Sequence, residues 1–230
     1  MRGGVSFLLL SGGVGSRSGY WEPKQFRKVK GIELVAYSLR LANAHPEISD
    51  IVVNAPEGYF SRTHELCEAF VTNKPVSVIP CGETRQESVC MLAEAARHDT
   101  VIVHEAARPL VDSHMIDALL KETCKNAGLF SPIPFSMCEI DAHTGMVSRN
   151  IPRKQVFNIQ LPQKFCRDTL LKAHLKAKAA GFEFTEDAVL ISEMAGAEVV
   201  ALPGYAKNIK ITSPEDFWFV EKYMEEESRT

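Results

Sequence analysis

Glycines and two cations near the amino terminus are the first residues in the chain whose types and spacing could do chemistry. The apolar run Val5 to Leu10 leads directly into Ser11-Gly12-Gly13-Val14-Gly15-Ser16-Arg17, and Pro23-Lys24-Gln25 follows at short range. Glycines allow the backbone to approach a ligand closely and to turn its amides toward phosphate oxygens. With Arg17 and Lys24 flanking those amides, the segment predicts a triphosphate site at the carboxyl end of the first strand.

Spacing argues against two common phosphate-binding motifs. Gly12, Gly13 and Gly15 followed by Arg17 form neither a Walker A motif ending in Gly-Lys-Ser/Thr nor a Gly-x-Gly-x-x-Gly fingerprint. P-loop hydrolysis and hydride transfer are therefore disfavoured. The alternative is an ordinary strand–helix turn with solvated basic residues, which is the commoner fate of an isolated glycine-rich segment.

Composition indicates one globular domain over residues 1–230, with 45% hydrophobic and 24% charged residues. The net charge of -3 gives no global attraction to nucleic acid or to an anionic membrane. The first thirty residues nevertheless hold six basic side chains and the single acid Glu22. A local anion site is therefore expected, and neither nucleic acid nor a membrane is expected as a partner.

The cysteines and the apolar runs predict the cellular location of the protein. The six cysteines are scattered singly, with no Cys-x-x-Cys pair and no nearby histidine cluster, so reduced thiols in a cytoplasmic protein are expected. Val5 to Leu10 is only long enough for a strand, which disfavours a signal peptide or a membrane span at this end.

Short β-branched or apolar runs alternate with helix-length amphipathic segments through the first two thirds of the chain. Such alternation is typical of an α/β fold with a Rossmann-like, doubly wound, mostly parallel sheet. We expect strands at 5–10, 50–54, 76–79, 100–104 and 129–133, and helices at 32–44, 60–71, 85–97 and 114–126.

The alternation breaks between Pro134 and Arg153, where polar residues surround the turn-forming His143-Thr144-Gly145. This pattern predicts a β-hairpin arm at about 134–153 that projects from the core. Beyond it we expect an apolar stretch at 156–161, helices near 169–179 and 187–195, strands at 198–202 and 209–212, and a final helix capped at Ser213-Pro214.

Four further motifs follow along the chain. They are Gly82-Glu83-Thr84-Arg85-Gln86-Glu87-Ser88-Val89, His104-Glu105-Ala106-Ala107-Arg108-Pro109, Pro162-Gln163 and Asn208-Ile209-Lys210-Ile211-Thr212. In this order, and over nearly the whole chain, the sequence resembles the cytidylyltransferases typified by 2-C-methyl-D-erythritol 4-phosphate cytidylyltransferase of the non-mevalonate isoprenoid pathway. Ribitol 5-phosphate cytidylyltransferases are close relatives, and the fold implied is of the nucleotide-diphospho-sugar transferase type.

The resemblance implies a CTP site and assigns residues to it. The triphosphate would be held by Leu10, Ser11, Gly12, Gly13, Gly15, Arg17 and Lys24, and cytosine and ribose by Gly82, Glu83 and Ser88, with Ala106 also at the nucleotide. Arg17 and Lys24 would act as catalytic cations, because charge builds on the α-phosphate and the departing pyrophosphate during in-line attack.

The resemblance also implies an acceptor site and a divalent cation. Glu105, at a position where the family usually has Asp, would ligate Mg²⁺ and contact the acceptor together with Arg108 and Ser136. Arg153 and Lys210 would position the acceptor's phosphate and so count among the catalytic residues. The arm would be exchanged between two subunits of a homodimer, because a protruding hairpin cannot bury its own apolar residues.

The chain departs from the family pattern near the acceptor. Ser136 and Cys138 stand where the family has threonine and lysine, and Leu161 replaces a threonine. We expect 2-C-methyl-D-erythritol 4-phosphate as the acceptor, with ribitol 5-phosphate as the alternative because Ile151-Pro152-Arg153 is similar to the ribitol-type relatives. Two further hypotheses are a catalytically inactive nucleotide-binding dimer and a sugar-phosphate nucleotidyltransferase that uses another nucleotide.

Overall fold

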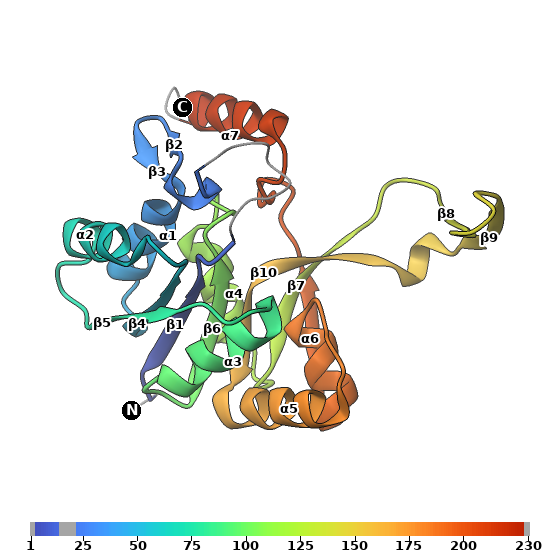
Figure 1. The fold of residues 1–230 in the computed structure, drawn as a ribbon, viewed down its shortest axis with the longest axis horizontal. Helices are drawn as coiled ribbons and strands as arrows, with labels where there is room; N and C mark the ends of the chain where they lie inside the picture. The colour runs from blue at the N-terminus through green and yellow to red at the C-terminus, as the bar shows by residue number, and fades with distance from the viewer. Residues whose placement is uncertain (1–2, 14–21, 228–230) are drawn as a thin grey trace.

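A seven-stranded sheet forms the centre of the computed structural model, which describes residues 3–13 and 22–227 (Figure 1). The strand order is β11-β7-β10-β6-β1-β4-β5, and only β10 runs antiparallel to its neighbours. The strands are β1 (Val5–Leu10), β4 (Ile48–Ala55), β5 (Val76–Pro80), β6 (Thr100–Glu105), β7 (Ala127–Pro132), β10 (Phe157–Cys166) and β11 (Val200–Pro203). The prediction of a mostly parallel α/β sheet is confirmed.

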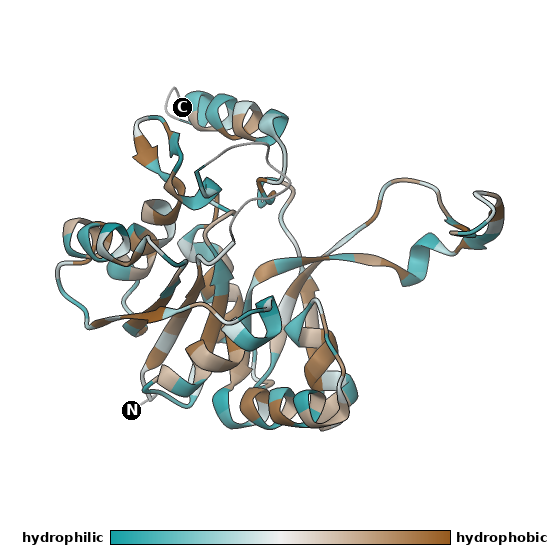
Figure 2. Cartoon of the chain, viewed as in Figure 1, coloured by the Kyte–Doolittle hydropathy of each residue, from teal (hydrophilic) through white to brown (hydrophobic). Residues whose placement is uncertain are grey.

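Helices cover both faces of the sheet. They are α1 (Leu34–Ala44), α2 (Phe60–Phe70), α3 (Arg85–Ala95), α4 (Ser113–Lys121), α5 (Arg167–Ala180), α6 (Asp187–Leu190) with a π-helical continuation at Ile191–Ala195, and α7 (Pro214–Glu227). Successive residues of β1 point to opposite faces, so Phe7 packs with α1, α2 and α4, whereas Leu8 packs with α3, α5 and α6. This double cover explains why every residue of β1 except Ser6 is apolar (Figure 2).

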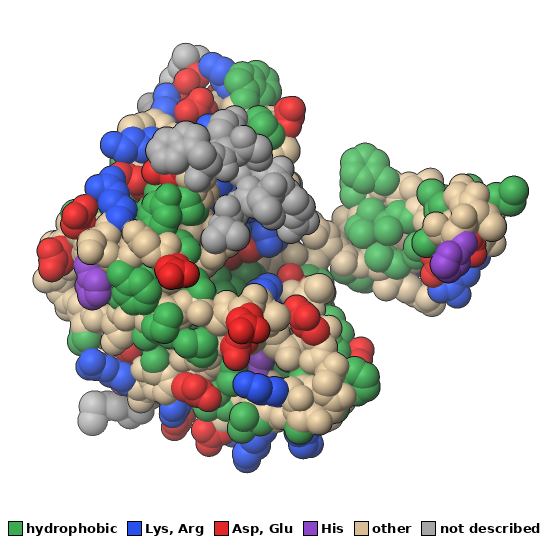
Figure 3. Space-filling model, viewed as in Figure 1, with side chains coloured by type: hydrophobic (Ala, Val, Ile, Leu, Met, Phe, Trp, Pro, Cys, Tyr) green, Lys and Arg blue, Asp and Glu red, His purple; other side chains and the backbone are tan. Residues whose placement is uncertain are grey.

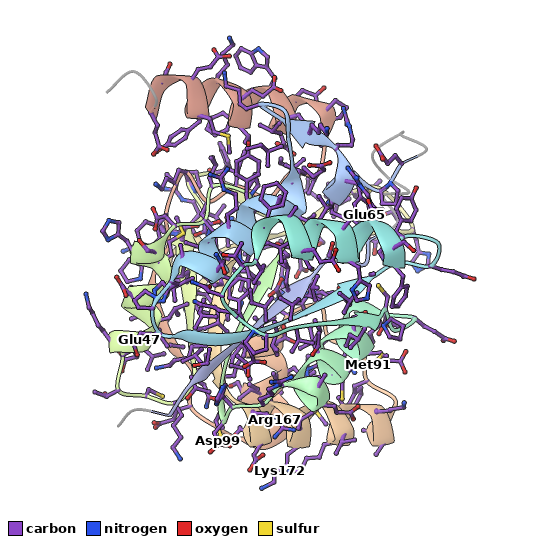
Figure 4. The ribbon with its side chains drawn as sticks, turned by 90° about the vertical axis from the view of Figure 1, so that its left-hand side faces the viewer. Glu47, Glu65, Met91, Asp99, Arg167 and Lys172 are labelled. Carbon is purple, nitrogen blue, oxygen red and sulfur yellow. The ribbon has the colours of Figure 1, made fainter. Side chains whose placement is uncertain are left out.

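Hydrogen bonds join the start of α5 to the sheet, where Arg167 and Asp99 are labelled in the side view (Figure 4). Arg167 begins α5, and its backbone N–H donates to the carbonyl of Asp99, just before β6, at 2.8 Å. The Arg167 guanidinium also donates to the carbonyl of Ala93 near the end of α3. Hydrogen bonds thus connect α5 to α3 and to the amino end of β6.

A smaller core lies under the carboxyl-terminal helix. There α7 packs with the short hairpin β2 (Lys28–Val29) and β3 (Ile32–Glu33) through residues that include Val29, Phe217 and Val220. Helix α7 begins at Pro214, as predicted, and Asp216 accepts the backbone N–H groups of Thr212 and Ser213 at 2.7 and 2.8 Å. This packing brings α7 beside the hairpin of β2 and β3.

A predicted strand and the end of a predicted helix are wrong. Residues 209–212 do not form a strand. The Ile211 N–H donates to the carbonyl of Ala107 at 2.8 Å, the Ile211 carbonyl accepts from a lysine side chain, and the Ile211 side chain is buried in the small core. Packing of Ile209 and Ile211 in the small core, rather than pairing with another strand, accounts for the apolar residues of this segment. The helix expected at 114–126 ends at Lys121, because the Glu122 carboxylate accepts the N–H of Cys124 in a tight turn.

The predicted arm is confirmed as a hairpin of β8 (Met137–Ile140) and β9 (Val147–Ile151), followed by a 3₁₀ turn η2 (Arg153–Gln155). Gly145 adopts a positive φ of 70° in the turn, where Asp141 accepts the N–H of Thr144. The arm stands well away from the body (Figure 1), and hydrophobic side chains lie on its surface (Figure 3). Phe135 and Val147 are among the exposed ones. A hairpin of this kind has little core of its own.

Candidate functional site

A cavity of about 380 Å³ opens at the carboxyl ends of four neighbouring parallel strands, β6, β1, β4 and β5. This edge of an open α/β sheet is where ligands bind. The lining residues are Leu10, Ser11, Gly12, Gly13, Lys24, Gln25, Asn54, Cys81, Gly82, Glu83, Thr84, Arg85, Ser88, Glu105, Ala106, Ala107 and Lys210. Segments far apart in the sequence therefore meet in one cavity.

The glycine segment after β1 is held in place by buried side chains. The Ser11 N–H donates to Asn54 Oδ1 at 2.6 Å, and the Ser11 carbonyl accepts from Gln25 Nε2 at 2.6 Å. Gly12 has no room for a side chain, because a Cβ there would lie 2.3 Å from Cys81 Sγ. The backbone of this segment is thus fixed at its first residue and exposes its glycines to the cavity.

The amino terminus of α3 forms the opposite wall. Gly82 donates its N–H to Ser88 Oγ at 3.0 Å, and Glu83 donates its N–H to a carboxylate oxygen of Glu87 at 2.9 Å. Thr84 caps the helix by accepting the Glu87 N–H at 3.1 Å. A Cβ on Gly82 would lie 2.9 Å from the Ser88 nitrogen, so this turn requires glycine. The positive end of the helix dipole therefore faces the cavity.

Two lysines from opposite ends of the chain reach the same rim. Lys24 lies in the 3₁₀ turn η1 (Lys24–Phe26), and its Nζ donates to the carbonyl of Ile211 at 2.8 Å. Lys210, one residue earlier in that segment, places its Nζ 2.6 Å from Glu105 Oε2. The small core under α7 fixes Ile211, so packing remote from the cavity sets the positions of both cations.

Glu105, at the end of β6, is a buried and ionised carboxylate. Its Oε1 accepts from Arg108 Nε at 2.7 Å, and Arg108 also donates to the carbonyl of Asn208 at 2.7 Å. Burial by itself would raise the pKa of Glu105, but the charges of Lys210 and Arg108 outweigh it and lower the pKa to about 2. Glu105 is therefore an acceptor-only group at neutral pH.

The comparisons with known proteins agree with this geometry. The family model described as 2-C-methyl-D-erythritol 4-phosphate cytidylyltransferase matches residues 5–226. The chain belongs to this family. Relatives with that name include one from Deinococcus radiodurans, 34% identical over 93% of this chain and 87% of that protein, and one from Bacillus licheniformis, 30% identical over 96% of each.

Solved structures of the family support the fold. A 4-diphosphocytidyl-2C-methyl-D-erythritol synthase from Anaerococcus prevotii superposes with a TM-score of 0.81 at 23% identity, over 96% of each chain. The 2-C-methyl-D-erythritol 4-phosphate cytidylyltransferase from Thermus thermophilus gives a TM-score of 0.75 at 26% identity, over 95% of this chain and 98% of that one. The sequence-based assignment to the cytidylyltransferase family is confirmed.

Most residues that the family resemblance assigned to the nucleotide meet in the cavity. Those found there are Leu10, Ser11, Gly12, Gly13, Lys24, Gly82, Glu83, Ser88 and Ala106, together with Glu105 and Lys210 from the acceptor set. Arg108 lies directly behind Glu105 and is buried. Gly15 and Arg17 lie outside the described residues.

Two residues expected at the acceptor are not part of this cavity. Ser136 and Arg153 are exposed on the arm, and Arg153 Nη1 donates to the carbonyl of Pro134 at 3.2 Å. The arm departs after β7, which runs parallel to β6, so it leaves from the same edge of the sheet that carries the cavity. It then projects away from the body of the chain (Figure 1), and none of its residues lines the cavity.

Sequence reasoning assigned no role to several lining residues. Asn54 carried a usable signal, because it is a polar residue that directly follows the apolar run Ile51-Val52-Val53 at the ligand-binding end of β4. Cys81 carried none, since its contact with Gly12 is made only by folding. Arg85 was part of a quoted motif, and it forms an ion pair with the buried carboxylate of Asp187 at 2.7 Å.

Glu105 is the residue expected to bind Mg²⁺, and its surroundings show whether it could do so. Within residues 3–13 and 22–227, no three His, Cys, Asp or Glu side chains are grouped so that they could hold a metal ion. Mg²⁺ needs only one or two carboxylates when substrate phosphates supply other ligands. A carboxylate offers about four lone-pair sites, and Arg108 and Lys210 each take one of them on Glu105. The donor set of Glu105 therefore fits Mg²⁺ bound together with a triphosphate.

Proposed function

We propose that this chain transfers the cytidylyl group of CTP to 2-C-methyl-D-erythritol 4-phosphate, producing a CDP-polyol and pyrophosphate in the non-mevalonate isoprenoid pathway. The observation that carries the proposal is the cavity in which the glycine segment, the α3 terminus, Lys24 and Lys210 converge. Its cations and backbone amides suit a polyphosphate, and the names of the relatives supply the base and the acceptor.

In the proposed reaction an oxygen of the acceptor's phosphate attacks the α-phosphorus of CTP. A new phosphorus–oxygen bond forms, and the bond between the α-phosphorus and the oxygen leading to the β-phosphate breaks, so pyrophosphate leaves with that electron pair. The attacking phosphate is already an anion, so orientation matters more than a general base. Lys24, with Arg17, would stabilise the charge that develops on the transferred and departing phosphates.

Glu105 has two roles in this proposal. Its ionised carboxylate holds Lys210 at the rim, at 2.6 Å, and so orients this cation toward the acceptor's phosphate. Glu105 would also hold Mg²⁺ together with phosphate oxygens, and the bound ion would neutralise part of the triphosphate charge. Arg108 is expected to act from behind Glu105, because it is buried and its guanidinium already holds Glu105 and the carbonyl of Asn208.

The arm is proposed to complete the acceptor site of a second copy of the chain. Exposed Phe135, Ile140, Met146 and Val147 give the arm an apolar surface that a homodimer would cover. Ser136 and Arg153 travel with the arm and lie outside the cavity of their own chain. A two-fold dimer would supply each cavity with these residues from its partner.

The proposal also covers the cellular location of the protein and its partners. All six cysteines are free, which supports the expected cytoplasmic location. None of the described helices has the length and apolar character needed to cross a membrane. The acidic net charge of -3 supports CTP and a small polyol phosphate as partners rather than nucleic acid.

Pyrophosphate release tests the proposal directly. Purified protein with Mg²⁺ and CTP is compared in the presence of 2-C-methyl-D-erythritol 4-phosphate, of ribitol 5-phosphate and of no acceptor. Release with the methylerythritol compound alone is the expected result, whereas release with ribitol 5-phosphate alone would assign the ribitol alternative. CTP binding by calorimetry without release from either acceptor would favour the inactive nucleotide-binding dimer. Competition by UTP, ATP or GTP as strong as by CTP would contradict the choice of nucleotide.

A further inference from the structure

We propose that Asn54 is a positioning residue for the nucleotide, fixing the glycine segment in the form that receives the triphosphate. The inference rests on the proposed function and adds a residue that no motif of the family resemblance contained. Asn54 lies near the end of β4, between β1, which carries the glycine segment, and β5, which leads to Cys81. It therefore stands at the centre of the edge where the cavity opens.

The Asn54 carboxamide and the Gln25 carboxamide hold one peptide residue from both sides. Asn54 Oδ1 accepts the Ser11 N–H and Gln25 Nε2 donates to the Ser11 carbonyl, each at 2.6 Å. All three residues are at least 95% buried. Since Ser11 is the last residue before the glycines, this pair of bonds sets the direction in which the glycine backbone leaves the strand.

A third contact fixes the next residue along. Gly12 packs so closely on Cys81 that an added Cβ would lie 2.3 Å from the sulfur and 3.2 Å from Asn54 Nδ2. The Nδ2 group is fully buried and has no hydrogen-bond partner among the described residues. Its partial positive charge therefore lies directly beneath the glycine segment, the side on which an anionic ligand benefits from it.

The consequence for binding follows from chain entropy. Glycines have the widest conformational freedom of any residue, so a triphosphate that must order them loses affinity. With Asn54 present, the first residue of the segment is already ordered before the nucleotide arrives. Without Asn54, the Ser11 N–H becomes a buried donor that lacks a partner and favours other backbone arrangements. Loss of Asn54 should therefore weaken nucleotide binding as well as folding.

A matched control separates these two effects. Asn126, like Asn54, is a buried asparagine whose Oδ1 accepts a backbone N–H, that of Cys166 at 3.0 Å; its Nδ2 in addition donates to the carbonyl of Glu198 at 3.1 Å. It lies beside the amino end of β7, at the opposite edge of the sheet from the cavity. Asn126→Leu therefore removes at least as many buried hydrogen bonds as Asn54→Leu without touching the glycine segment.

The experiment compares wild type, Asn54→Leu and Asn126→Leu in the full chain. The measurements are calorimetric affinity for CTP with Mg²⁺, the rise in Tm that CTP causes, and KM for CTP from pyrophosphate release. We expect Asn54→Leu to weaken CTP binding and raise KM by about tenfold, and to reduce the rise in Tm accordingly. Asn126→Leu should lower the ligand-free Tm and leave CTP affinity within twofold of wild type. If Asn54→Leu does not fold, Asn54→Ala takes its place, since the smaller side chain leaves space for water beside Ser11.

The outcomes are distinct. CTP affinity within twofold of wild type in the Asn54 variant would overturn the inference, and so would equal weakening in both asparagine variants. Wild type that binds CTP without releasing pyrophosphate would remove the proposed function, and the affinity comparison would still decide the role of Asn54. Wild type that neither binds CTP nor turns it over would overturn both proposals.

Discussion

Replacing Glu105 by glutamine tests whether the buried charge cluster behind the cavity stabilises the protein. The Glu105 and Arg108 residues are only 8% and 6% exposed, and the carboxylate is held by Arg108 at 2.7 Å and by Lys210 at 2.6 Å. Glu105→Gln keeps the size and one acceptor oxygen but removes the charge. It leaves the Arg108 guanidinium buried without its counter-ion. Because the glutamine amide has only one acceptor oxygen, its NH2 donor must face Arg108 or Lys210, and both of these side chains have donors only.

The magnitude follows from the pKa of Glu105. The charges of Lys210 and Arg108 more than offset its burial, and its pKa falls from the ordinary 4.5 to about 2. Such a difference corresponds to roughly 3 kcal/mol of stability at neutral pH. In a chain of 230 residues, a loss of this size lowers Tm by roughly 6–12 °C.

The pH dependence gives a second signature. Because the folded-state pKa lies below the unfolded-state value, the stabilisation is complete above about pH 4.5 and is lost as the pH falls through about 2. The Tm difference between wild type and Glu105→Gln should therefore be constant from pH 7 to pH 5.5 and shrink below pH 4.5. Differential scanning calorimetry at several pH values measures both proteins without ligand.

A matched control and a clear refutation accompany this test. Glu139 on the arm forms an exposed ion pair with Arg149, and Glu139→Gln should leave Tm unchanged within error because solvent screens such pairs. A Tm of Glu105→Gln within 2 °C of wild type at pH 7 would refute the argument that the buried cluster stabilises the fold. A difference that stayed constant below pH 4.5 would refute the assignment of the effect to the carboxylate's charge.

Three further predictions concern catalysis, the arm and a thiol. Lys24→Met should lower kcat/KM for CTP about 10²–10³-fold, because a preorganised cation at the phosphates is lost; steady-state kinetics decide, and a loss under tenfold would count against a catalytic role. An equal mixture of Arg153→Ala and Lys210→Ala chains, refolded or coexpressed, should regain about a quarter of wild-type pyrophosphate release, since half the dimers then hold one complete site. No recovery from a mixture shown to form mixed dimers would contradict the exchange of arms. Burial raises the pKa of the Cys81 thiol to about 11, so at pH 8 iodoacetamide should modify exposed Cys138 well before Cys81; mass spectrometry of the peptides that finds equal rates would contradict this.

The sequence by itself determined the class of fold and most of the nucleotide site. Alternating apolar runs and amphipathic segments are local signals, and the parallel sheet follows from them because each strand and helix must bury its apolar face on a neighbour. The segment 11–13 was recognised from its own glycines, which let a backbone approach a ligand, and the segment 82–88 was recognised from its resemblance to a family motif. The hairpin arm was equally readable, from a break in the pattern around Gly145.

Only the tertiary structure decided how the charged groups of the site are paired. Glu105 owes its ionised state to Arg108 nearby and to Lys210, a hundred residues away along the chain. The strand predicted at 209–212 is absent because the apolar Ile211 is buried beneath α7 rather than in a sheet. Arg153 and Ser136 likewise lie on an arm that projects away from the body of the chain (Figure 1), and neither residue lines the cavity. Local spacing specifies elements and turns, whereas ion pairs, cavities and close contacts such as Gly12 on Cys81 arise between segments that meet only when the chain has folded.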